Sequence, residues 1–418
     1  MHAPRSNRTM LTFALLVSGA LASSCASKRT ADLDPLEPGE LGVAIRCGRV
    51  LTVDDDDATY GPGLVLVKNG RIAYVGPDRA VPAGYPVEER LDLWASPGMV
   101  ELHAHVHGPG GDINDMVYPV NADLRASAGF VPGNRAIRLA CAGGVTTLFG
   151  IPGSGTSIGG FGILFKAKTA GATYDEATIR DPGGMKVAQS YNPERRAGDL
   201  GATRAGLSWI LEQWNEEARV ANREGTSTPM LENLQKVHSR ELPVLIHSAG
   251  SDGYPAAARM WHVKYGARAV LSHGCFDAHM TAPWLVELGV PLNVGPREID
   301  FSTTRDGKIT GTAARYLEAG ARNLSLNTDS PVVPQEELFL QGAVAARYGA
   351  DSHTMLRAVT IAPARVFGLD DRVGSLEVGK DADVVLRTGE PLDPRSRVEV
   401  VFIDGLVEYD RRRDGQWF

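Results

Sequence analysis

Between residues 97 and 363, short apolar runs alternate with longer stretches of helical pattern, and this alternation constrains the fold more than any other feature. Strands that alternate with helices in this way are typical of a parallel sheet. Eight strands in about 250 residues predict an α/β fold, a (β/α)8 TIM-type barrel with its active site at the carboxyl ends of the strands. The expected strands are centred on 99–102, 146–149, 163–165, 185–188, 244–246, 269–271, 291–294 and 324–326.

The segments on either side of this barrel have the pattern of short β-strands. Residues 41–96 contain β-rich runs such as 64–67 (LVLV) and 71–75 (RIAYV), separated by Asn-Gly and Gly-Pro turns that are typical of hairpins. Residues 364–418 return to this pattern at 374–386 and 398–407. We therefore expect a small β-sandwich domain built from both chain ends. The acidic run 54–57 lacks the rest of a calcium-loop pattern and is predicted to be a solvated turn.

Residues 1–25 have the features of an export signal. Arg5 and Arg8 precede an apolar run, 10–22, that ends in small residues and Cys25. The segment 21–25 (LASSC) resembles a bacterial lipoprotein cleavage site, in which Cys25 would be lipidated, although Leu21 lies one position early. Ordinary cleavage after Ala22 is the alternative. The sequence thus predicts an exported protein, periplasmic or membrane-anchored through this lipid alone, with residues 26–40 as a polar linker.

Composition narrows the classes of partner. The chain has 418 residues, of which 43% are hydrophobic and 22% charged, so it can bury a large core. A net charge of -7 without clustered Lys and Arg gives no reason to expect a nucleic-acid partner. Apart from Cys25, the widely spaced Cys47, Cys141 and Cys275 do not suggest a disulfide framework. A small-molecule substrate is expected, and a homo-oligomer is compatible with the sequence.

Metal-ligand residue types end four of the predicted strands. His103 and His105 are two apart at the end of the first strand, so both side chains point to the same side of it. Three later apolar strands finish on His247, on His273 and on Asp329. A single buried histidine is usually a hydrogen-bonded core residue, but the carboxyl ends of barrel strands meet at one face. The five residues together therefore predict a metal centre.

The segment 97–105 (PGMVELHAH) resembles the first-strand motif of the amidohydrolase superfamily. Segments 360–368 (TIAPARVFG) and 374–385 (GSLEVGKDADVV) are similar to the last barrel helix and the returning β domain of its imidazolonepropionase-like branch, which is related to Xaa-dipeptidases. The resemblance covers about residues 43–410. It implies an amidohydrolase that cleaves a C–N bond, amide or peptide-like, of a small substrate by metal-activated water. A cyclic-amide hydrolase or deaminase of the same superfamily is an alternative, and a non-catalytic, metal-containing binding lipoprotein is another.

Lys186 bears on the number of metals. In the segment 184–188 (GMKVA), it is placed like the lysine that related peptidases carboxylate to bridge two metals. Lys166, on the third strand, is the competing lysine, and a plain ion pair is the alternative role for Lys186. Some relatives instead use a glutamate after the fourth strand, but residues 190–192 (SYN) contain none.

The resemblance implies one or two divalent ions. Zn²⁺ prefers imidazole and carboxylate ligands, and a catalytic metal lowers the pKa of bound water from about 15.7 to about 7. Asp329 would take the water proton and pass it to the leaving nitrogen. With two metals, the first would be held by His103, His105, Lys186 and Asp329, and the second by Lys186, His247 and His273. With one metal, His103, His105, His247 and Asp329 remain ligands, and His273 orients water or substrate.

Two segments are candidates for substrate recognition. The loop 152–160 (PGSGTSIGG) could bind a substrate oxygen through backbone N–H groups, or be a flexible turn. Arg297 could hold a substrate carboxylate, as a planar guanidinium does, or pair with Glu298 or Asp300. Tyr191, just after the fourth strand, is a further candidate substrate contact.

Overall fold

The structure is a computed structural model that describes residues 33–110, 113–169, 171–194, 203–300 and 309–418. The chain divides into two units, Met1–Asp34 and Pro35–Phe418, and the elements below belong to the second. The predicted export signal, residues 1–25, and the first part of the linker lie outside the described residues. Within the described ranges, no helix combines the length and the apolar character that crossing a bilayer requires.

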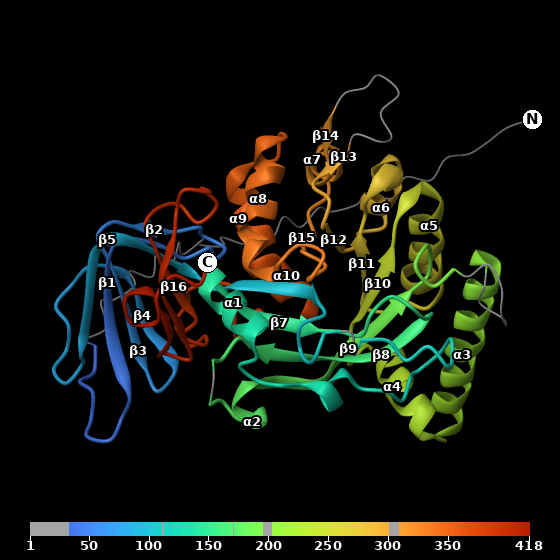
Figure 1. Ribbon diagram of the computed structural model, residues 1–418, viewed down its shortest axis with the longest axis horizontal. Helices are drawn as coiled ribbons and strands as arrows, with labels where there is room; N and C mark the ends of the chain where they lie inside the picture. The colour runs from blue at the N-terminus through green and yellow to red at the C-terminus, as the bar shows by residue number, and fades with distance from the viewer. Residues whose placement is uncertain (1–32, 111–112, 170, 195–202, 301–308) are drawn as a thin grey trace, which may run out of the picture. The chain divides into compact units, whose positions relative to one another are not determined.

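Strands from both chain ends form one eight-stranded sheet, blue and red in Figure 1. Its central strand β5 pairs in parallel with β1 and antiparallel with β16, so the C-terminal strands add directly to the N-terminal ones. Apolar residues such as Ile45, Val65 and Phe402 form a core within this sheet domain. The strands are β1 (Gly42–Leu51), β2 (Thr59–Tyr60), β3 (Gly63–Lys68), β4 (Arg71–Pro77), β5 (Val87–Pro97), β16 (Val384–Arg387), β17 (Val398–Ile403) and β18 (Leu406–Asp410).

A second eight-stranded sheet, in chain order from β6 to β15, forms the barrel. Its strands coincide with the eight predicted apolar runs, and β7, β10 and β11 are buried at every position, as strands covered on both faces must be. A bridge between Ala104 and Ser330 brings the first and last strands together. The strands are β6 (Met99–Ala104), β7 (Val145–Gly150), β8 (Ile158–Lys166), β9 (Thr178–Ala188), β10 (Val244–Ser248), β11 (Ala269–His273), β12 (Leu292–Val294) and β15 (Leu324–Leu326).

The expectation of an all-parallel sheet is wrong for one strand. β8 runs antiparallel to both β7 and β9, whereas the other neighbours in this sheet are parallel. The connection from β7 to β8, residues 151–157, is shorter than the dozen or so residues that a parallel crossover needs. Consequently Lys166, at the end of β8, lies near the start of β9, at the opposite end of the barrel from the carboxyl ends of the parallel strands.

The helices follow local signals in the sequence. For example, α1 begins where the Asn134 side chain accepts a hydrogen bond from the Ile137 amide and ends at Gly144, whose φ of 89° is left-handed. The described α-helices are α1 (Arg135–Gly143), α2 (Tyr174–Ala177), α3 (Arg204–Glu224), α4 (Pro229–His238), α5 (Gly250–Ala257), α6 (Ala282–Glu287), α7 (Thr312–Glu318), α8 (Leu338–Arg347), α9 (Ser352–Ala358), α10 (Ile361–Phe367) and α11 (Arg411–Asp414). The other described elements are the 3-10 helices η1 (Ala126–Gly129), η3 (Phe276–Thr281) and η4 (Gln335–Glu337), the π-helix η2 (Ala258–Lys264), and the strands β13 (Ile299–Asp300) and β14 (Thr310–Gly311).

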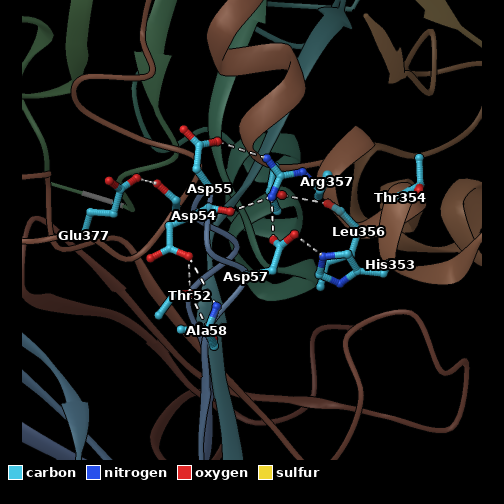
Figure 2. A network of polar contacts seen from close by, with 12 residues as sticks. Thr52, Asp54, Asp55, Asp57, Ala58, His353, Thr354, Leu356, Arg357 and Glu377 are labelled. Carbon is cyan, nitrogen blue, oxygen red and sulfur yellow. Dashed lines mark hydrogen bonds and ion pairs between the residues drawn. The ribbon is translucent and has the colours of Figure 1, made fainter. Parts of the chain in front are cut away.

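The acidic turn between β1 and β2 is exposed to solvent at residues 55–57, as predicted, and it also attaches the sheet domain to the barrel helices (Figure 2). Arg357 on α9 donates to the Asp54 carbonyl at 2.6 Å and to the Asp57 carboxylate at 2.5 Å. His353 Nε2 lies 2.9 Å from Asp57 Oδ2. Asp55 pairs with Arg365 on α10. The carboxylates therefore meet cations of the protein itself.

Candidate metal centre

Two histidines of the first barrel strand converge on one carboxylate. His103 Nε2 lies 3.2 Å and His105 Nε2 lies 3.3 Å from Asp329 Oδ1. One ligand atom from each residue lies within 4.8 Å of the others, which is the spacing of a metal site. His105 Nδ1 is 2.9 Å from the Ile151 carbonyl, which can only accept, so this nitrogen carries the hydrogen and Nε2 keeps its lone pair. The three residues can thus present ligand atoms to one cation.

His247 and His273, on the adjacent strands β10 and β11, form a direct pair. His273 Nδ1 is 3.0 Å from the Gly295 carbonyl and therefore donates, which leaves its Nε2 to accept from His247 Nδ1 at 2.6 Å. His247 Nε2 is then an acceptor, yet it is buried without a hydrogen-bond partner among the described residues. Buried polar atoms normally have partners, so an orphaned imidazole nitrogen beside two further histidines fits a metal ligand.

Burial keeps these imidazoles in the metal-binding state. It is the largest cause that lowers the pKa of His103 and of His247 well below the usual value, and neighbouring histidines and Lys186 add to it. Both rings are therefore neutral near pH 7. The ring centroids of His103 and His273 are 4.5 Å apart, so the two groups of histidines form one cluster.

The two candidate lysines differ sharply in surroundings. Lys186 is fully buried on β9, and its Nζ donates to Ser154 Oγ at 2.6 Å. Burial lowers its pKa to about 7, and no described carboxylate lies within ion-pairing distance. Lys166 instead contacts Asp383 at 2.7 Å and Asp381 at 2.9 Å, and these charges raise its pKa despite burial. The structure removes Lys166 from the site and leaves Lys186 as a partly neutral amine.

Glu101 was not singled out from the sequence. It is fully buried on β6, accepts the His103 amide at 2.8 Å, and accepts both the amide and the hydroxyl of Thr328 at 2.9 and 2.7 Å. Burial raises its pKa to about 8. Because Thr328 precedes Asp329, this carboxyl group connects the strand that carries the histidines to the segment that carries the aspartate. Its only sequence signal is an acidic residue inside an apolar strand.

Two residues of the candidate metal centre have an unusual backbone. His273 has a φ of 78° and Asp329 a φ of 49°, which is left-handed backbone that non-glycine residues rarely adopt. Such conformations cost free energy and cluster at functional sites, where the surrounding structure holds them. His273 is the last residue of β11, and Asp329 lies three residues after the end of β15.

The candidate substrate residues meet at Phe276. The Tyr191 ring lies 5.6 Å from the Phe276 ring, and the Arg297 guanidinium carbon lies 5.8 Å from it. Within the described part of the chain, Arg297 has no ion pair, including with Glu298. The side chain of Asp300 lies outside the description. Among the described side chains, no carboxylate pairs with Arg297, which lies on the aromatic surface that it shares with Tyr191.

The loop 152–160 is held by the loop that follows β6. The Gly153 amide donates to the Ile113 carbonyl at 2.6 Å, and the Gly155 amide donates to Asn114 Oδ1 at 2.9 Å. The Ile158 amide donates to the Pro119 carbonyl at 3.1 Å, so at least three N–H groups of this loop are used within the protein. Its contribution to the site is Ser154, the hydrogen-bond partner of Lys186.

Comparison with known proteins defines the class. Residues 94–407 match the amidohydrolase family, so the chain belongs to this family and the prediction from the sequence motifs is confirmed. A solved amidohydrolase from Thermotoga maritima MSB8 is 30% identical, with a TM-score of 0.79 over 88% of this chain and 100% of that one.

Two curated relatives are more distant in sequence. The 5-methylthioadenosine/S-adenosylhomocysteine deaminase of Syntrophobacter fumaroxidans is 26% identical over 81% of this chain and 83% of that protein. Amidohydrolase tasK of Hapsidospora irregularis is 24% identical over 85% of this chain. This chain spans only 41% of the length of tasK.

Proposed function

We propose that this protein is a metal-dependent hydrolase that cleaves an amide or peptide-like C–N bond of a small substrate. The observation that carries the proposal is the convergence of His103 and His105 on Asp329 Oδ1, at 3.2 and 3.3 Å, in a member of the amidohydrolase family. A divalent metal bound there would supply a nucleophilic water at neutral pH and polarise the substrate carbonyl. The imidazole and carboxylate ligand set favours Zn²⁺.

The chain's own residues supply the proton transfers. Asp329 faces both histidines, so its carboxylate is placed to take the proton of the attacking water and pass it to the leaving nitrogen. In the one-metal version, the ligands are His103, His105, His247 and Asp329. His273 would then orient the water or the substrate through Nε2, which would have to exchange its hydrogen bond with His247 Nδ1 for that contact, while Nδ1–H stays held by the Gly295 carbonyl.

A two-metal version requires a carboxylated Lys186. An amine must lose its proton before it adds carbon dioxide, and the pKa of about 7 leaves a large neutral fraction at neutral pH. The added group would convert a buried cation into an anion. The modified Lys186 would then be a ligand of both metals, and His247 and His273 would be the other ligands of the second one. Mass analysis of the native protein after incubation with ¹³C-bicarbonate tests this version. An unmodified Lys186 in protein that holds two metals would contradict it.

Substrate recognition is proposed to involve Arg297 and Tyr191. A guanidinium at an aromatic surface that has no ion-pair partner among the described residues can hold a carboxylate, which favours acylated amino acids or dipeptides. The alternative, a cyclic-amide hydrolase or deaminase, gains weight from the deaminase among the relatives. The alternative outside the enzymes is a metal-containing lipoprotein that binds a small molecule without converting it.

A substrate screen with loaded and metal-depleted enzyme tests the function. N-acyl amino acids, dipeptides, cyclic amides and aminopurine nucleosides should be compared, with activity lost on chelation and restored by Zn²⁺. Arg297→Met should raise KM for carboxylate-bearing substrates and leave neutral ones unchanged. Turnover of aminopurines alone would select the deaminase, and a loaded protein inactive on every class would favour the binding protein.

We also propose that the protein is exported and anchored through a lipid on Cys25. The support is the basic and apolar pattern of residues 1–25 alone. Mass spectrometry of the mature N-terminus would show a lipidated Cys25, whereas an unmodified start at Ser23 would contradict the anchor.

A further inference from the structure

Four buried side chains form a continuous hydrogen-bonded chain inside the barrel. His103 Nδ1 lies 2.7 Å from Ser272 Oγ, which lies 3.2 Å from Asn293 Oδ1, and Asn293 Nδ2 lies 2.9 Å from Ser325 Oγ. These residues belong to β6, β11, β12 and β15 and are at most 1% exposed. A buried network of this kind has few alternatives to its internal hydrogen bonds.

The direction of the hydrogen bonds follows from the far end of this chain. Ser325 Oγ is 3.1 Å from the Leu292 carbonyl, which can only accept, so Ser325 donates its hydrogen there. The Asn293 nitrogen donates to Ser325 and also faces the Leu326 carbonyl at 3.2 Å. A reversed amide would place its oxygen against that carbonyl, two acceptors facing each other. The amide oxygen of Asn293 must therefore face Ser272.

The state of His103 is then determined. Ser272 has one hydrogen, which it donates to the Asn293 oxygen, so it must accept a hydrogen bond from His103. Nδ1 of His103 thus carries the hydrogen, and in the neutral ring Nε2 carries the lone pair. Among the described residues that nitrogen is buried without a hydrogen-bond partner, and it faces Asp329 Oδ1 at 3.2 Å. Two acceptors facing at this distance leave a place for a cation.

We propose that Ser272 and Asn293 are positioning residues that fix the tautomer in which His103 binds metal through Nε2. His105 and His273 have the corresponding hydrogen held by backbone carbonyls, which no side-chain substitution removes. His103 differs because side chains hold it, and partners of this kind orient metal-binding histidines. The inference rests on the proposed metal-dependent function.

Ser272→Ala and its matched control Ser325→Ala test the proposal. Each variant removes one hydroxyl from a buried serine of the same network. Without the Ser325 hydroxyl, the Asn293 nitrogen still donates to the Leu326 carbonyl, so the Asn293 oxygen still faces Ser272 and the direction of the hydrogen bonds is kept. In zinc titrations of metal-depleted protein against a competing chelator, Ser272→Ala should weaken binding about 10- to 100-fold. Ser325→Ala should weaken it much less. Equal affinities in the two variants would overturn the proposal.

A spectroscopic measurement decides the tautomer without any variant. In metal-free wild-type protein with ¹⁵N-labelled histidine, long-range ¹H–¹⁵N correlation should show His103 protonated at Nδ1. Protonation at Nε2 would overturn the proposal, even if Ser272→Ala fails to fold. A wild-type protein that binds no zinc would contradict the proposed function, whereas zinc binding with the wrong tautomer would contradict this inference alone.

Discussion

A substitution of Asp329 tests the proposed proton transfer most directly at the level of a single residue. Its carboxylate contacts two candidate ligands, and its proposed proton transfer requires an ionisable group. Asp329→Asn keeps the shape and one oxygen, so we expect zinc to be retained in part while kcat falls about 10²- to 10⁴-fold. Steady-state kinetics and elemental analysis on the same sample measure both. Asp351→Asn, at the exposed start of α9, is the control and should keep full activity. Comparable kcat in both variants would remove Asp329 from proton transfer.

Glu298 gives a pH dependence outside the metal centre. Burial raises its pKa from 4.5 to about 8, and the nearby Ala313 amide offsets only part of this rise. Between these values the folded protein keeps a proton that the unfolded chain has lost, so the group's contribution to stability falls as pH rises. Above about pH 8 the loss is complete and constant.

Glu298→Gln should therefore become more stable relative to wild type as pH increases from 5 to 8. We expect a gain of about 1–3 kcal/mol, the usual cost of a buried polar group without partners. Urea denaturation at several pH values measures the difference. Stability curves that run parallel for the two proteins would show that Glu298 titrates normally.

The candidate ligands could be selected from the sequence because the apolar run of each strand ends on them. The residues that hydrogen-bond to these candidate ligands could not be predicted from the sequence. Glu101 contacts Thr328, which is 227 residues away, and Ser272 contacts His103 across 169 residues. A serine or a buried acid inside a strand has no local pattern that distinguishes it, and its role appears only when the strands are side by side.

At the scale of the elements, strand positions follow from burial, whereas strand direction follows from the connections. The apolar runs predict all eight barrel strands, since each is covered on both faces. The direction of β8 is encoded in the short connection 151–157, a constraint on the backbone path rather than on hydrophobicity. The same reversal places Lys166 in the aspartate cluster that connects β8 to the C-terminal segment.

This cluster predicts a difference between two lysines. Lys166→Met would leave Asp383 buried without its cation, and we expect a loss of about 3–5 kcal/mol in the free energy of unfolding. Lys168 pairs with the more exposed Asp404, so Lys168→Met should cost only about 0–1 kcal/mol. Urea denaturation of both variants measures the two values. Equal losses would mean that the cluster does not stabilise this end of β8.

For the whole molecule, the motifs near residues 97–105 and 374–385 predict the family, and the match over residues 94–407 confirms it. Substrate choice is harder to predict, because in barrels it depends on loops whose contacts are specific to each protein. Here the candidate contacts, Tyr191 and Arg297, meet through Phe276, a residue without any motif.

The central claim is a metal centre built on His103, His105 and Asp329, and the metal content of chelator-free protein tests it most directly. Elemental analysis should find one or two divalent ions per chain, and His105→Asn should lower that number. Two ions would support the bridge through Lys186, and one would support the single-metal version. Protein that contains no metal and takes up none on addition of Zn²⁺ would contradict the account.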